Sequence, residues 1–457
     1  MNQGKKYLLM LVDVVILYFS LWLTLLLRYQ TDFNTLLLVR HIWPFTVVFL
    51  GWLIIFYIDD IYEITYSQGN ATFLVKLLRN FLIGGLFAVV FFYLGQDRLF
   101  TIKPQTVLLI NSVIAAVLIY GWHLLFFSLT KSPKMANGLL IIGFNHLALE
   151  IINYIKNNPQ LGYQIKAIMA DGDKVSEDMK EFITNNDFSQ LKETCIQKGI
   201  NTIISTIHPR ENSTLSDNLF KCLSLKINFF DISNFYEKIT GKIPVNTIEQ
   251  IWFLENLSES AKKLYEKAKR LFDITFALTL LIITLPFFPI IALITKLGSK
   301  GPIFFTQIRT GKDGKDFKAI MFRTMIQDAE TNGPQWAAKN DSRVTKTGKI
   351  FRKTRIDELP QLFNILRGDM SLIGPRPERP EFVKQLQNEI PFYNERLLIK
   401  PGLTGWAQVV GPAYGGSKEE SLQKLQYDLY YIKNRSIALD LSILLKTIKT
   451  VLTVRGQ

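Results

Sequence analysis

Two adjacent acidic residues, Asp357 and Glu358, lie in the sequence's densest cluster of side chains able to do chemistry. Arg352 and Arg355 shortly precede them. A carboxylate beside cations stays ionised, which both a nucleophile and a metal ligand require. Neighbouring residues on a helix point about 100° apart, so one carboxylate could face a phosphorus atom while the other reaches a cation. A surface cluster of ion pairs is the alternative interpretation.

A second candidate for phosphate chemistry is Arg376, which stands between Pro375 and Pro377. The prolines restrict the backbone around it to an extended loop. A planar guanidinium held in this way can grip phosphate oxygens through two parallel hydrogen bonds. Upstream, two glycines predict a hairpin turn in a basic stretch that contains Arg309, Lys312, Lys315, Lys318 and Arg323. Taken alone, that stretch could also be a solvated basic face.

The elements that must position these residues belong to a long basic chain. Its 457 residues are too many for one ordinary domain. Lys and Arg total 53 against 39 Asp and Glu, a formal charge of +14 that favours an anionic partner. No nucleic-acid-binding motif accompanies this charge, and cations that flank membrane segments explain it more simply. Two cysteines, Cys195 and Cys222, exclude a disulfide scaffold.

The first part of the chain, residues 1–133, is predicted to be a membrane bundle. A bilayer core needs roughly 20 apolar residues per helix. Four stretches approach this length: Tyr7–Leu27, Ile42–Ile58, Phe81–Gly95 with the leucines before it, and Gln105–Thr130. An even number of spans leaves both ends on one side, and the flanking lysines and arginines favour the cytoplasm. For Asp13, inside the first span, we expect helix pairing or snorkelling rather than catalysis.

Residues 134–255 are predicted to form a doubly wound α/β domain, because apolar runs alternate with helical patterns. The predicted strands are Gly138–Gly143, Gln164–Met169, Asn201–Ile207 and Lys226–Phe230. A dinucleotide site would need G-x-G-x-x-G after the first strand. Here Asn145 and Ala148 replace the second and third glycines. We therefore favour a degenerate Rossmann-like domain with a regulatory or oligomerising role over a working cofactor site.

The uncharged run from Ile274 to Thr295 is long enough to cross a bilayer. Pro286 and Pro289 break its middle, and basic residues flank both of its ends. Two cationic flanks favour the same anionic membrane face, so we predict a re-entrant helix–break–helix hairpin over residues 271–297. The alternative is a kinked fifth span, which would leave the following residues outside the cell.

From about Lys263 to the C-terminus, the chain resembles the bacterial sugar transferases. The matching segments are Phe322-Arg323-Thr324-Met325, Asp357-Glu358-Leu359-Pro360-Gln361, Gly368-Asp369-Met370-Ser371, Gly374-Pro375-Arg376-Pro377, Lys400-Pro401-Gly402-Leu403-Thr404-Gly405-Trp406-Ala407-Gln408 and Tyr427-Asp428-Leu429-Tyr430-Tyr431. The resemblance implies an α+β monotopic phosphoglycosyl transferase domain over residues 256–457. The four spans and the α/β domain resemble the large subgroup that starts exopolysaccharide, capsule or O-antigen synthesis with glucose or galactose.

The resemblance also implies roles for the site residues. Asp357 matches the nucleophile that attacks the β-phosphorus of a UDP-sugar, expels UMP and forms a phosphosugar-aspartyl intermediate, which polyprenyl phosphate then accepts. Glu358 matches a ligand of Mg²⁺. Arg352 and Arg376 match phosphate-binding arginines, and we expect Arg323 to bind phosphate as well. The implied location is the bacterial inner membrane with the catalytic domain on the cytoplasmic face. The implied partners are a UDP-sugar, polyprenyl (undecaprenyl) phosphate and membrane lipids, without nucleic acid, and a homodimer is a further candidate.

Two positions depart from the family's pattern. Met321 stands where the family usually has Lys before the Phe-Arg-Thr-Met run, so a cationic contact is lost unless Lys318 supplies it. At the hairpin break, Leu285 precedes Pro286 where the family often has Ser. The hydroxyl of Thr284 could satisfy backbone groups there instead.

Two rival functions remain to be weighed. A membrane-bound nucleotide-sugar dehydratase would need a Tyr-x-x-x-Lys pair; Tyr265 and Lys269 have that spacing, but no intact glycine fingerprint precedes them. A non-enzymatic membrane scaffold would not need the intact acidic pair. The tail, Leu439–Val454, is predicted to be an amphipathic helix that either lies on the membrane or packs against the catalytic domain.

Overall fold

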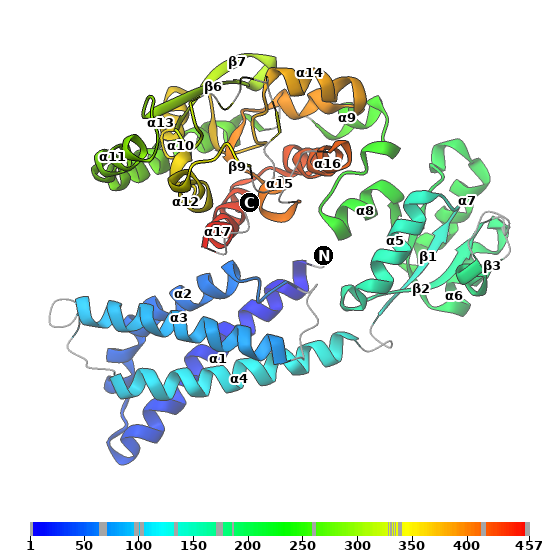
Figure 1. The fold of residues 1–457 in the computed structure, drawn as a ribbon. Helices are drawn as coiled ribbons and strands as arrows, with labels where there is room; N and C mark the ends of the chain where they lie inside the picture. The colour runs from blue at the N-terminus through cyan, green and yellow to red at the C-terminus, as the bar shows by residue number, and fades with distance from the viewer. Residues whose placement is uncertain are drawn as a thin grey trace. The chain divides into compact units, whose positions relative to one another are not determined.

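The computed structural model describes residues 3–63, 71–95, 100, 105–131, 136–170, 177–184, 187–257, 262–327, 329, 331, 333, 335–336, 341–412 and 417–452. The chain divides into two compact units, Met1–Thr240 and Gly241–Gln457. The first contains the apolar helices and the α/β domain, and the second contains the acidic pair (Figure 1). Ile243 and Val245, within the predicted middle domain, pack in the core of the second unit.

Four long helices begin the first unit: α1 (Gln3–Tyr29), α2 (Thr35–Ile58), α3 (Ala71–Gly95) and α4 (Gln105–Lys131). Each is long and apolar enough to cross a membrane, and together they cover the four predicted spans. α1 packs against α4, and α2 packs against α3 (Figure 1). The prediction of an apolar N-terminal helical bundle is confirmed.

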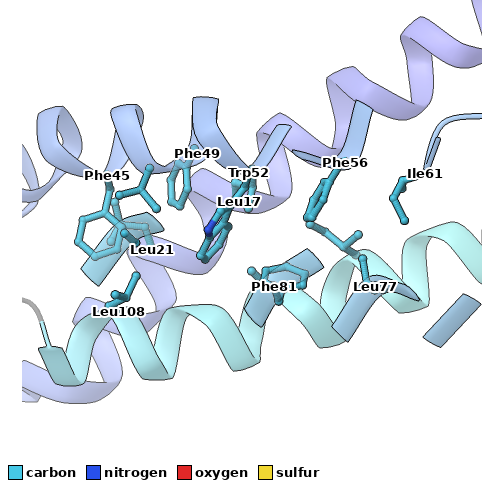
Figure 2. Close-up of a cluster of buried hydrophobic side chains, with 14 of the residues drawn as sticks. Leu17, Leu21, Phe45, Phe49, Trp52, Phe56, Ile61, Leu77, Phe81 and Leu108 are labelled. Carbon is cyan, nitrogen blue, oxygen red and sulfur yellow. The ribbon is translucent and has the colours of Figure 1, made fainter. Parts of the chain in front are cut away.

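Aromatic and leucine side chains fill the interior of this bundle. Figure 2 shows them reaching inward from all four helices, among them Leu17, Leu21, Phe45, Phe49, Trp52, Phe56, Phe81 and Leu108. Trp52 is fully buried, and a Cβ atom at Gly84 would overlap its indole ring. The missing side chain at Gly84 therefore allows α2 and α3 to approach closely, as small residues do between membrane helices.

One polar pair is buried inside the bundle. His123 Nε2 of α4 lies 3.0 and 3.2 Å from the two carboxylate oxygens of Asp13 on α1, and neither side chain is exposed. The ring of Phe73 stacks on His123. Asp13 therefore joins two helices, as expected from the sequence.

A five-stranded parallel sheet follows the bundle, in the order β3-β2-β1-β4-β5. Its strands are β1 (Asn137–Ile142), β2 (Tyr163–Met169), β3 (Ile183–Thr184), β4 (Ile200–Ser205) and β5 (Asn228–Asp231). Its helices are α5 (His146–Asn157), α6 (Leu191–Lys198), α7 (Ser213–Lys221) and α8 (Ile232–Thr240). The two-residue β3 carries too little pattern to be predicted, and the other four strands overlap their predicted ranges.

Successive residues of β1 point to opposite faces of the sheet and build two cores. Leu139 and Ile141 pack with residues of α5 and α8. Leu140 and Ile142 pack with residues of α6 and α7. Helices therefore cover both faces of the parallel sheet.

The turn after β1 is capped by its own chain. Asn145 Oδ1 accepts a hydrogen bond from the Ala148 amide at 2.9 Å, which closes the N-terminus of α5. A phosphate bound at this helix N-terminus would need the Ala148 amide to be free, but Asn145 already accepts its hydrogen bond. This geometry is consistent with the interpretation of a degenerate turn.

The second unit combines helices with two small sheets. Antiparallel β6 (Phe304–Thr310) and β7 (Asp316–Phe322) form the predicted basic hairpin, and β8 (Ser371–Ile373) and β9 (Gly402–Thr404) form a parallel pair. Outside the long apolar run, the helices are α9 (Gln250–Asn256), α12 (Lys346–Thr354), α13 (Gln361–Arg367), α14 (Pro380–Glu389), α15 (Trp406–Val410), α16 (Lys418–Asn434) and α17 (Ile437–Leu452).

The long apolar run of this unit forms two helices, α10 (Lys263–Thr284) and α11 (Phe288–Gly298). A short 3-10 turn at Leu285–Phe287 joins them, which places the break at Pro286. Thr284 Oγ1 donates a hydrogen bond to the Leu280 carbonyl at 2.7 Å. This hydroxyl bonds the Leu280 carbonyl, whereas the carbonyl that loses its amide donor to Pro286 is that of Ile282.

Both halves of the run pack on the second unit through one face. Ala277 and Leu281 of α10 lie in its main core, and Phe288 and Ile291 of α11 pack in a smaller core with Phe322. The opposite face is apolar and exposed, with Leu278, Ile282, Ile283, Leu285, Phe287, Ile290, Leu293 and Leu297.

The C-terminal helix α17 also packs against this unit. Ile443 is fully buried in the main core, and the hydroxyls of Thr447 and Thr404 lie 2.7 Å apart. Ile437 and Leu441 remain exposed. Of the two alternatives for the tail, packing is therefore observed, and an apolar stripe is left for a membrane surface.

Candidate active site

Arg355, a residue in the left-handed conformation, changes the direction of the chain just before the acidic pair. α12 ends at Arg355, which has φ +58°. Positive φ is uncommon for a residue other than glycine and is often found at functional sites. The 3-10 turn Ile356–Glu358 follows and buries both acids, leaving 8% of Asp357 and 7% of Glu358 exposed.

Glu358 is held by two arginines. Its Oε1 atom accepts hydrogen bonds from Arg355 Nη1 at 3.0 Å and Arg376 Nη2 at 2.9 Å. Burial alone would raise the pKa of this carboxyl, but the two guanidinium groups outweigh burial and lower the pKa well below its usual range. Glu358 is therefore an ionised, fixed group.

Asp357 is in the opposite situation. Its Oδ1 atom is buried and has no hydrogen-bond partner among the described residues. Burial and then the neighbouring charge of Glu358 raise the pKa of Asp357, against the opposing charges of Arg355 and Arg352. The raised pKa of Asp357 contradicts the expectation that neighbouring cations keep it ionised, because burial and the Glu358 charge outweigh the arginines. A buried carboxyl oxygen without a partner among the described residues is typical of a group kept available for reaction.

Arg376 comes from a loop fixed by backbone contacts. The Gly402 amide donates to the Pro375 carbonyl at 2.9 Å, and Arg309 Nη1 donates to the Pro377 carbonyl at 3.0 Å. A Cβ atom at Gly402 would overlap the backbone of Gly374, so glycine is required for this approach. The loop thus aims the guanidinium at Glu358 before any substrate arrives.

A buried arginine network supports the same loop. Arg396 Nη2 donates to the Arg376 carbonyl at 2.9 Å, and its Nε donates to Asp428 Oδ2 at 3.1 Å. Burial raises the pKa of Asp428 to about 6, although Arg396 counteracts this. We did not predict Arg396, which lies outside every motif segment; Asp428 lies inside one and was the available signal.

The remaining predicted arginines occupy different places. Arg352 Nε donates to Thr324 Oγ1 at 2.9 Å, and the Arg352 charge acts on Asp357. Arg323 instead donates to the Ser299 carbonyl at 2.7 Å, and the Thr295 carbonyl lies 3.4 Å from the same nitrogen. The structure therefore brings Asp357, Glu358, Arg352 and Arg376 together and places Arg323 at the end of α11.

The departure at Met321, in β7, can also be located. Met321 lies opposite Phe305 in the hairpin, and β7 packs against the 3-10 turn of the acidic pair. Lys318 is three residues away, so its side chain leaves the opposite face of the strand. Lys318 therefore does not replace a cation at Met321 on the same face.

Tyr265 and Lys269, whose spacing suggested a dehydratase pair, serve a different contact. Both donate to Asp440 Oδ2 of α17, at 2.8 and 3.0 Å. They join α10 to α17 inside the second unit. Their spacing of one helical turn places both side chains on the same face of α10, where they reach the same carboxylate oxygen.

The carboxylates can be tested as a magnesium site. Among the described residues, no group of three His, Cys, Asp or Glu side chains could hold a metal ion by itself. Mg²⁺ commonly uses one or two carboxylates and completes its octahedron with water and substrate phosphates. Glu358, as an ionised carboxylate beside the acid expected to react, fits the single protein ligand of such a partial donor set.

Comparison with known proteins gives a consistent result. Residues 264–454 match the model of the family described as "Bacterial sugar transferase". A relative from Aeromonas hydrophila, "UDP-N-acetylgalactosamine-undecaprenyl-phosphate N-acetylgalactosaminephosphotransferase", is 43% identical over 52% of this chain and 55% of its own length.

Two further relatives differ in length. "UDP-glucose:undecaprenyl-phosphate glucose-1-phosphate transferase" of Klebsiella pneumoniae is 32% identical over 66% of this chain and 64% of its own length. "Exopolysaccharide production protein PSS" of Rhizobium leguminosarum bv. phaseoli is 40% identical over 41% of this chain and 96% of its own length. The chain therefore spans only 55–64% of the two longer relatives, although it covers nearly all of the short one.

Proposed function

Because this chain belongs to the bacterial sugar transferase family, we propose that it transfers a sugar 1-phosphate from a UDP-sugar to undecaprenyl phosphate. The observation that carries the proposal is the unpaired Oδ1 atom of Asp357 beside an arginine-held Glu358, inside the family-matched segment. The names of the Aeromonas and Klebsiella relatives support this reaction. The name of the Rhizobium relative supports a role in exopolysaccharide production.

In the proposed first step, Asp357 Oδ1 attacks the β-phosphorus of the UDP-sugar. A phosphorus–oxygen bond forms to the carboxylate, and the bond to the bridging oxygen breaks, so that UMP leaves with the electron pair. In the second step, a phosphate oxygen of undecaprenyl phosphate attacks the same phosphorus and the Asp357 carboxylate leaves. The product is an undecaprenyl-diphosphate sugar.

The arginines support both steps electrostatically. The diphosphate and the carboxylate are all anionic, so the approach is repulsive unless cations surround it. Arg352 lies near Asp357, and Arg376 is held against Glu358 by a rigid loop. We propose that both guanidinium groups bind phosphate oxygens in the same way in both steps. When bound, Mg²⁺ would neutralise phosphate charge, with Glu358 as its carboxylate ligand.

The chain is a membrane protein. Its described residues include five helical segments that are long and apolar enough to cross a membrane. We propose that the fifth, α10–α11, is re-entrant. Asp273 near the start of the run contacts Leu372, and Arg323 contacts Ser299 at its end, so both ends are tied to one compact unit. A straight membrane-crossing helix would carry these ends to opposite faces. The catalytic unit would then lie on the cytoplasmic face of the inner membrane, where UDP-sugars occur.

The test is UMP release from the full chain in vesicles that contain undecaprenyl phosphate. The donor panel should contain UDP-N-acetylgalactosamine and UDP-glucose, after the named relatives, together with UDP-galactose. We expect one donor to give UMP that depends on Mg²⁺ and a labelled sugar phosphate on Asp357 when the acceptor is omitted. Product formation without an adduct on Asp357 would contradict the proposed mechanism, and no release with any donor would contradict the proposed function.

A further inference from the structure

A strand edge beside the active-site loop is closed by a carboxylate from the membrane segment. β8 pairs with β9 through Ser371 and Ile373, which face Gly402 and Thr404. In a parallel pair the residue between two paired residues directs its amide to the other edge. That residue is Leu372, which is 2% exposed, so its amide would be a buried donor without a ladder partner.

Asp273 of α10 supplies the missing acceptor. Its Oδ1 atom accepts from the Leu372 amide at 3.0 Å and from Ser371 Oγ at 3.1 Å. The Ile373 amide lies 3.3 Å from the same Ser371 hydroxyl oxygen. Asp273 is 3% exposed and is the last charged residue before the uncharged run. One buried carboxylate at the base of the membrane segment thus holds the whole of β8.

β8 leads directly to the phosphate-binding loop. The Gly374 amide donates to the Thr404 carbonyl at 2.9 Å, and two residues later Arg376 reaches Glu358. A shift of β8 would therefore move the guanidinium by a similar amount. Misplacement of a binding group by about 1 Å can cost a reaction about a hundredfold in rate.

We propose that Asp273 is a positioning residue that fixes Arg376 relative to the membrane hairpin. The inference rests on the proposed function, because the loop matters only if Arg376 binds substrate phosphate. Asp273 itself does not touch the substrate. Its hydrogen bonds set the distance between the segment that meets the lipid and the arginine that meets the donor.

The test is a double-mutant cycle on the full chain in vesicles. Asp273→Leu removes the acceptor at similar size, whereas Asp273→Asn retains an acceptor oxygen. We expect Leu to lower kcat/KM for the UDP-sugar about 10–100-fold, mainly through kcat, and Asn to lower it less than about threefold. In an Arg376→Ala background, Asp273→Leu should cost less than about twofold more. Thr275→Val, on an exposed position of the same helix, is the control and should leave kcat/KM unchanged.

A merely structural role would give a different pattern. Loss of folded protein would lower activity equally in both backgrounds, and that result, or equal damage by Asn and Leu, would overturn the proposal. Hydrogen exchange of residues 371–376 gives a readout that is independent of turnover, and we expect faster exchange in Asp273→Leu only. If the unaltered chain releases no UMP, the proposed function fails. Unchanged exchange in Asp273→Leu would instead refute the coupling itself.

Discussion

The molecule buries two pairs of ionisable residues, and the two pairs are built in opposite ways. In the bundle, Asp13 faces His123 with both of its oxygens, and the surroundings are aromatic. In the second unit, Asp357 and Glu358 are two acids side by side, and arginines surround them. In the first pair an acid meets a base directly, whereas in the second pair two neighbouring acids depend on the arginines.

The difference shows how a joint can be distinguished from a reactive site. An acid that meets a base inside an apolar core can hold two helices together without an additional cation. Two neighbouring acids can be buried only if cations compensate both. Here the compensation is uneven, because Glu358 accepts hydrogen bonds from both Arg355 and Arg376. Within the described part of the chain, Asp357 keeps its Oδ1 atom without a hydrogen-bond partner. Each substitution below tests whether the Asp13–His123 pair acts only as a structural contact between helices and the Asp357–Glu358 pair as a reactive site.

The largest effect is expected at Asp357. Asp357→Asn removes the nucleophilic charge but keeps the size, so UMP release should fall by at least about a thousandfold, while membrane insertion persists. Asp13→Asn is the matched control, since it makes the same change in the other pair, and it should retain most activity. UMP release in vesicles measures both variants. Equal loss in the two variants would remove the distinction between the pairs.

The next largest effect is expected at Arg376, a cation that binds the acidic pair and has no counterpart among the described residues at the Asp13–His123 pair. Arg376→Lys keeps the charge but loses the planar fork that can hold Glu358 and a phosphate together, so kcat/KM should fall about 10–100-fold. Arg367→Lys, at an exposed position at the end of α13, is the control and should change kcat/KM less than about threefold. A lysine variant with full activity would show that charge alone is sufficient.

A smaller effect, on stability rather than activity, is expected in the bundle. His123→Leu removes the basic partner of the buried Asp13 carboxylate and should lower the free energy of unfolding by about 1–2 kcal/mol. Replacing both residues by leucine should recover part of this loss, because no polar group is then left unpaired. Thermal unfolding in detergent provides the measurement. The double variant being less stable than the single one would argue against a simple joint.

The sequence predicted local features better than partners. The parallel strands and the basic hairpin follow from apolar runs and glycine turns, and the acidic pair follows from its motif. By contrast, the partner of Asp13 is 110 residues away, and nothing local in the sequence selects His123. Likewise, nothing local in the sequence predicted that Nη2 of Arg323 would reach the carbonyls at the end of α11. Contacts between distant segments depend on packing, which a single sequence does not reveal.

The smallest expected effect is at Met321, where the reactive site lacks a cation that its family usually has. β7 packs against the turn of the acidic pair, so Met321→Lys adds a charge near three arginines that already act on Asp357. An additional half-exposed cation is typically worth about 0.3–1 kcal/mol, so we expect KM for the UDP-sugar to fall about two- to fivefold with kcat nearly unchanged. Met321→Leu is the control for shape and should do nothing. High salt should reduce the gain, because screening weakens an exposed charge more than a buried one. A large rise in kcat would instead mean that the arginines alone do not neutralise the negative charge of the transition state. In that case the positive charge around the acidic pair, Glu358 included, would be incomplete.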